Sequence, residues 1–103
     1  MTVPASGTLR AAGNGRYCLG GAVTVATVTA LRAEGLQAFA GSAGAIEVDL
    51  GQVERADSGA LALLIDWLAW ARAAGRAMKF SALPAALLAL ARLSDVEELL
   101  LGG

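Results

Sequence analysis

The hydrophobic and polar positions along the chain follow two periods, and these periods predict its elements. Alternation every second residue indicates strands, and apolar positions three and four residues apart indicate helices. Strands are expected at residues 7–12, 16–19, 45–50 and 77–81. Helices are expected at residues 24–40, 59 or 60–74 and 84–93, with a last short helix running through Leu100. Gly13, Asn14 and Gly15 predict a tight hairpin turn between the first two strands, since both residue types tolerate positive φ.

The order of these elements predicts an α/β fold. Strands that are separated by helices lie parallel to one another in a single sheet, so the later strands of this chain are expected to be parallel. The polar stretch after residue 50 is expected to be a short loop that leads into the longest helix. A length of 103 residues indicates one domain, residues 1–103.

The longest expected helix carries two apolar stripes, whereas one stripe is enough to pack a surface helix on a sheet. Leu63, Trp67 and Trp70 belong to the second stripe, and two interpretations of it remain open. The tryptophans could pack beneath a neighbouring helix. Alternatively the three side chains could anchor a partner protein, because tryptophan is enriched at interface hot spots. A hydrophobic content of 56% favours the partner-binding interpretation.

Composition excludes several function classes. Eight basic and nine acidic residues leave a net charge of -1, which does not attract nucleic acid. The chain has no histidine, so it has neither a Ser-His-Asp set nor a histidine-based metal site, and we expect no cofactor and no metal. Its single cysteine, Cys18, forms no intrachain disulfide, which suits a reducing cytoplasm. Cys18 is expected to be a small core residue rather than a reactive thiol.

Asp57, Ser58 and Gly59 form the most informative polar group, because they stand where the longest helix begins. Asp and Ser are preferred N-cap residues, so one of them could simply cap the helix. A hydroxyl at a helix N-terminus could also be a docking point or a phosphorylation site, since the helix dipole favours negative charge there. Catalysis by Ser58 is disfavoured because no histidine can serve as its base.

Glu47 and Asp49 are two carboxylates on alternate positions of the third strand. Such a pair could perform acid–base chemistry. The commoner explanation is that the two residues form the polar face or the end of a strand, and we favour it here.

The run from Ile46 to Ile65 resembles the signature of STAS domains, the sulfate-transporter and anti-sigma-factor-antagonist family. That signature is a strand ending in Asp-Leu, a short loop, and Asp-Ser or Asp-Thr opening a helix with small residues and leucine. Here it matches Asp49-Leu50 and Asp57-Ser58-Gly59-Ala60-Leu61. The resemblance implies the STAS fold, a mixed sheet of about four strands with helices mainly on one face.

Two branches of this family imply different functions. The helix after Gly59 is more similar to the MlaB-like branch, whose members are cytoplasmic, non-catalytic subunits of the Mla phospholipid-transport ABC system. That branch implies an ATP-binding subunit as partner, association with the inner membrane only through the complex, and a role in outer-membrane lipid asymmetry. Asp57, Ser58, Gly59, Leu63, Trp67 and Trp70 would then form the partner-binding surface.

The other branch contains anti-sigma-factor antagonists, which a partner kinase switches off by phosphorylating a serine in this loop. Ser58 would be that serine, and an anti-sigma factor kinase would be the partner. Members of this branch often have two adjacent hydroxyl residues at this point, whereas this chain has Gly59 at the second position.

Overall fold

The computed structural model describes residues 7–100, which form four strands and four helices. The strands are β1 (Gly7–Gly13), β2 (Arg16–Val23), β3 (Ile46–Ala56) and β4 (Met78–Ser81). The helices are α1 (Val28–Ala40), α2 (Ser58–Ala73), α3 (Ala85–Leu93) and α4 (Glu97–Leu100). The order of elements is the one that the hydrophobic pattern predicts.

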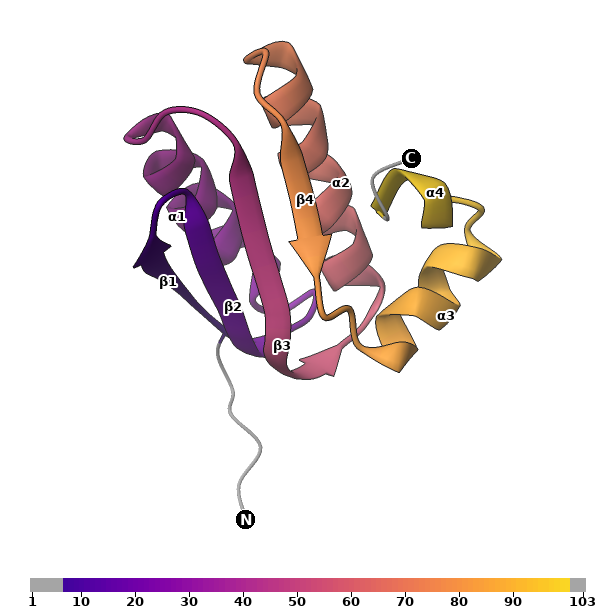
Figure 1. The fold of residues 1–103 in the computed structure, drawn as a ribbon. Helices are drawn as coiled ribbons and strands as arrows, with labels where there is room; N and C mark the ends of the chain where they lie inside the picture. Colours follow the sequence, from indigo (N-terminus) through magenta and orange to yellow (C-terminus); the bar gives the residue numbers. More distant parts are fainter. Residues whose placement is uncertain (1–6, 101–103) are drawn as a thin grey trace.

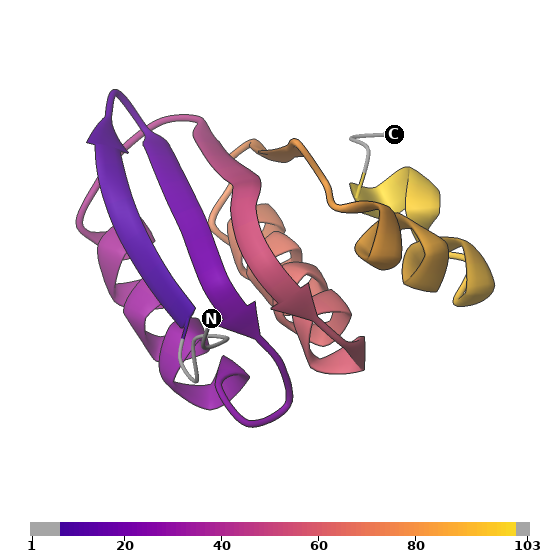
Figure 2. The same cartoon turned by 90° about the horizontal axis from the view of Figure 1, so that it is seen from below.

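The strands form one mixed sheet in the order β1-β2-β3-β4, with an antiparallel β1–β2 hairpin and parallel β2–β3 and β3–β4 pairs. Figures 1 and 2 show α1 and α2 side by side on one face of this sheet, while α3 and α4 lie beyond β4. The expected α/β fold, a four-stranded mixed sheet with helices mainly on one face, is confirmed. Within residues 7–100 no helix covers the opposite face of the sheet (Figure 2).

Two strands are several residues longer than expected, and one of them delays the start of the helix that follows. β2 continues to Val23, so the helix expected from residue 24 begins only at Val28. The Thr27 hydroxyl accepts a hydrogen bond from the Thr24 amide at 3.0 Å and donates one to the Ala22 carbonyl at 2.8 Å. These bonds hold residues 24–27 as a turn, which we call the β2–α1 loop.

β3 is the second element that is longer than expected. Residues 51–56 were expected to form a loop, but they stay paired with β2 up to Ala56. The register shifts twice along this pairing, once between Cys18 and Gly20 and once between Gly21 and Ala22. These irregularities break the strict alternation of apolar and polar residues, which is the signal that predicts a strand.

An aromatic cluster forms the centre of the core between the helices and the sheet. Phe39 packs edge-to-face against Tyr17 and Trp67, with ring centroids 5.0 and 5.2 Å apart. Trp67 is completely buried. Its indole lies against the backbone of α1 at Gly35, and the ring nitrogen points toward the Arg32 carbonyl.

Arg76, just after the C-terminal end of α2, links α2 to the C-terminal end of α1 and to the segment that follows it. Its guanidinium donates hydrogen bonds to the carbonyls of Phe39 and Gly44 and to the Ser42 hydroxyl. The same group lies 5.6 Å from the centre of the Trp70 ring, within the range of a cation–π contact. One side chain therefore joins the end of α2 to the segment between α1 and β3.

Gly35→Ala should destabilise the protein, although Ala is the better helix former. A Cβ at this position would overlap Trp67 atoms, including the ring nitrogen at 2.7 Å. Overpacking of this kind costs about 1–3 kcal/mol, which offsets the gain of about 1 kcal/mol that Gly→Ala gives in an open helix. Urea unfolding measures the change.

The control for this prediction is the double variant Gly35→Ala/Trp67→Phe. Phenylalanine lacks the part of the indole that the new Cβ would overlap. The double variant should therefore be more stable than the sum of the two single changes predicts. Strict additivity would contradict the proposed contact.

Candidate functional site

The turn between β3 and α2 brings an exposed hydroxyl to the start of the longest helix. Asp57 is the N-cap, in extended conformation, and its Oδ1 accepts a hydrogen bond from the Gly59 amide at 2.7 Å. Ser58 is the first residue of the helix, and it is exposed. Asp57 is thus the residue that caps the helix, which leaves the Ser58 hydroxyl free of that task.

Asp57 also holds the β2–α1 loop against the start of α2. The Val25 amide donates to both carboxylate oxygens of Asp57, at 3.1 and 3.2 Å. One carboxylate therefore accepts hydrogen bonds from backbone amides of two separate segments, at Val25 and at Gly59. The Val25 side chain itself is 67% exposed, so this contact presents an apolar side chain to solvent near Ser58.

Gly59 is buried because the β2–α1 loop lies directly on it. A Cβ there would come 2.6 Å from the Val25 amide nitrogen and 2.9 Å from the Thr24 carbonyl carbon. Any side chain at this position would push the loop away. Position 59 must therefore be glycine for this loop packing to form.

A shallow groove of about 160 Å³ lies on the helical face, and its lining includes Ala62, one helical turn after Ser58. Its walls are formed by α1 and α2, and the residues that line it are Val28, Thr29, Arg32, Ala62, Leu63 and Asp66. Arg32 and Asp66 form an ion pair across it. The surface beside Ser58 is therefore made of small side chains, one apolar loop residue and one ion pair.

A comparison with known protein families identifies the family of this chain. The family described as Mlab, STAS domain, matches residues 7–102, nearly the whole chain. The chain belongs to the MlaB-like STAS family. A comparison with curated proteins finds no match. STAS domains are in general regulatory or interaction domains without catalytic activity.

Two of the residues that we expected on a partner-binding surface are buried in the core of the domain. Leu63 is 2% exposed and Trp67 is completely buried, while Trp70 is half-buried against Phe39 and Arg76. The expectation that Leu63 and Trp67 are exposed anchors is therefore wrong. The second apolar stripe of α2 packs against α1, because Gly35 leaves room for an indole between the helices. Leu63 reaches the surface only as part of the groove wall.

The two carboxylates of β3 take part in structural contacts. Glu47 lies 3.6 Å from Arg16 on β2 and 3.5 Å from Lys79 on β4, and these pairs cross three neighbouring strands. Asp49 accepts a hydrogen bond from the Gly51 amide at 2.7 Å. Glu47 thus supports the register of the parallel strands, in agreement with the interpretation as a polar strand face.

Cys18 was expected in the core, but it is only partly buried and lines a hollow on the uncovered face of the sheet. Within residues 7–100 no cluster of three potential metal-ligating side chains is found. None of the helices formed by these residues is long and apolar enough to cross a bilayer.

Asp57→Ala should lower the free energy of unfolding by about 2 kcal/mol, because the change removes the helix cap and leaves the Val25 amide without its acceptor. Asp57→Asn keeps one acceptor oxygen and should cost less. Asp66→Ala is the matched control, since an exposed ion pair contributes only about 0–1 kcal/mol. Urea unfolding measures both changes. Equal losses of unfolding free energy for Asp57→Ala and Asp66→Ala would contradict the role of Asp57 in capping α2 and holding the β2–α1 loop.

Proposed function

We propose that this chain is a non-catalytic subunit of an Mla-type phospholipid-transport ABC complex, and that it binds and regulates the ATP-binding subunit of that complex. It would act on the cytoplasmic side of the inner membrane, held there by its partner, and would help to maintain outer-membrane lipid asymmetry. The observation that carries this proposal is the family match over residues 7–102.

The surface around Ser58 is the part of the domain that best suits such contact. Ser58 offers a hydroxyl that the helix cap does not consume, and Val25 beside it offers exposed apolar area. The Val25 amide is hydrogen-bonded to Asp57 and Ser58 follows Asp57 in the chain, so the backbones at Val25 and Ser58 are held close together. A partner would therefore meet a preformed patch, and little conformational entropy would be lost when it binds.

The groove behind Ser58 extends this patch and replaces the buried tryptophan stripe as the expected contact area. Ala62 is exposed one helical turn after Ser58, and Asp66 follows one turn later. Small side chains allow another protein to approach the helix backbone closely. The Arg32–Asp66 pair offers both signs of charge at the rim.

Ser58→Glu should reduce recovery of the ATP-binding subunit in co-purification by at least about tenfold, because it places a bulky charge at the centre of the proposed contact. Folding should be retained, since an acidic residue at the start of a helix is favourable. Ala86→Glu is the matched control, because it adds the same charge to an exposed position in the first turn of α3. Unchanged recovery with Ser58→Glu would overturn the docking role of Ser58.

Phosphorylation of Ser58, as in anti-sigma-factor antagonists, is the second candidate, and the exposure of the hydroxyl favours it. A phosphate there would gain from the helix dipole but would stand next to the Asp57 carboxylate. Incubation with a cognate anti-sigma factor kinase and ATP, followed by intact mass measurement, separates the two functions. A mass increase of one phosphate that Ser58→Ala abolishes would favour the second candidate, and no increase would favour the first.

A further inference from the structure

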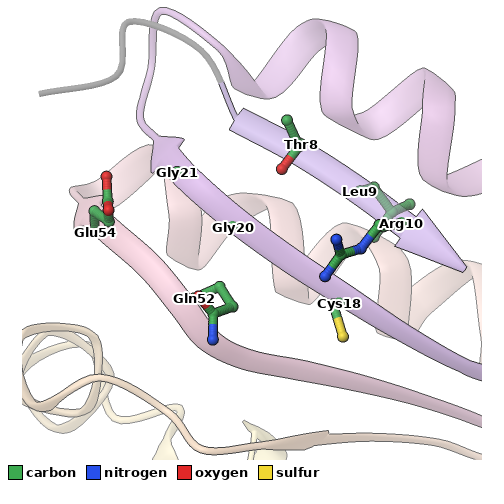
Figure 3. Close-up of a pocket in the computed structure, with 8 residues that line it drawn as sticks. All are labelled: Thr8, Leu9, Arg10, Cys18, Gly20, Gly21, Gln52 and Glu54. Atoms are coloured by element: carbon green, nitrogen blue, oxygen red, sulfur yellow. The ribbon is translucent and has the colours of Figure 1, made fainter. Parts of the chain in front are cut away.

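The uncovered face of the sheet carries a hollow that the proposed function does not use. Its volume is about 550 Å³, within the range of roughly 300–1,000 Å³ that is typical of small-molecule sites. Three strands contribute to it, β1, β2 and β3 (Figure 3). The residues that line it are Thr8, Leu9, Arg10, Cys18, Gly20, Gly21, Gln52 and Glu54.

Two glycines of β2 form the floor of this hollow. A Cβ at Gly20 would come 3.0 Å from the Gln52 Cβ and 3.2 Å from the Gln52 carbonyl oxygen, so a side chain there would crowd Gln52 and occupy the space. Gly21 has a φ of +77°, which favours glycine, and the β2–β3 register shifts next to it. Bulges of this kind are frequent beside binding sites.

Opposite charges stand at the two ends of the hollow. Figure 3 shows Arg10 of β1 at one end, with its guanidinium extending over β2, and Glu54 of β3 at the other. Within residues 7–100 neither side chain takes part in an ion pair. Glu47, on the same face, has two cationic partners. This end of the sheet therefore leaves one positive and one negative group available to a ligand.

The strand register gives the distance that such a ligand must span. Arg10 pairs with Cys18, and Val53, the neighbour of Glu54, pairs with Gly21. The two Cα atoms are thus about three residues apart along the strands and two strands apart across the sheet, roughly 10 Å in each direction and about 14 Å on the diagonal. Because the Arg10 guanidinium extends over β2 (Figure 3), by about one strand spacing of roughly 5 Å, about 11 Å is left for a ligand to bridge. A single amino acid is too short to bridge this distance, whereas three extended residues span about 10–11 Å.

We propose that this hollow binds a short zwitterionic peptide of about three residues, with its carboxylate at Arg10 and its ammonium group at Glu54. Charge-assisted hydrogen bonds would hold the two ends. The Thr8 hydroxyl and the Gln52 amide, which line the hollow between them, would bind the peptide groups. A second copy of the chain fits less well. Two hollows placed face to face would leave an unfilled cavity in the interface, whereas buried protein surfaces are closely packed.

Triglycine is the probe, titrated at millimolar concentration into the isotope-labelled full chain and followed by NMR. The amide signals of Arg10, Cys18, Gly20, Gln52 and Glu54 should shift, while that of Ser58 should not. N-acetyltriglycine lacks the ammonium group and triglycinamide lacks the carboxylate, so each should bind at least about fivefold more weakly. Absent shifts, shifts centred elsewhere, or equal affinities for the three peptides would overturn the proposal.

Single-charge variants test the assignment of each end. Arg10→Gln should weaken triglycine binding but leave triglycinamide unaffected, and Glu54→Gln should weaken triglycine binding but leave N-acetyltriglycine unaffected. Arg55→Gln is the matched control, since Arg55 is an exposed neighbour of Glu54 that does not line the hollow. Sedimentation velocity tests the other occupant, and a dimer that Arg10→Gln dissociates would overturn the peptide assignment.

Discussion

The contact between the Trp67 indole and the backbone at Gly35 determines how the helical layer of this domain is built. It allows α1 and α2 to approach closely enough for Phe39 to pack on the same indole. The close approach also brings Arg32 within reach of Asp66 across the two helices. The narrow groove behind Ser58 is therefore a surface consequence of one core contact.

Asp57 fixes the arrangement of the backbone at the surface, where α2 begins. A carboxylate that only capped α2 would leave the β2–α1 loop free, and a carboxylate that only held the loop would leave the helix uncapped. Because Asp57 does both, it joins the loop to the start of the helix, beside Ser58. This arrangement requires glycine at position 59, since a side chain there would push the β2–α1 loop away from the start of α2.

Periodicity was sufficient to predict the order of strands and helices, because most of these elements bury one face. It failed where local geometry interrupts the period, as in the irregular pairing of residues 51–56. It also failed for Trp67, because a helical wheel shows that a second apolar stripe exists but not which element covers it. Gly35 within an otherwise regular helix was the available signal for close helix packing, and its meaning depends on a partner 32 residues away. The hollow at Gly20 could not be predicted, since it results from strand register and a missing side chain together.

The contacts of Arg76 have a consequence for the mechanics of the domain. They fasten the helical layer at the end opposite to the one that Asp57 holds, and they do so through backbone carbonyls and one hydroxyl. A layer fixed at both ends resists shear between α1 and α2. A force that a partner applied at the start of α2 would then be transmitted to the whole sheet. The domain would move as a rigid body rather than bend at a hinge.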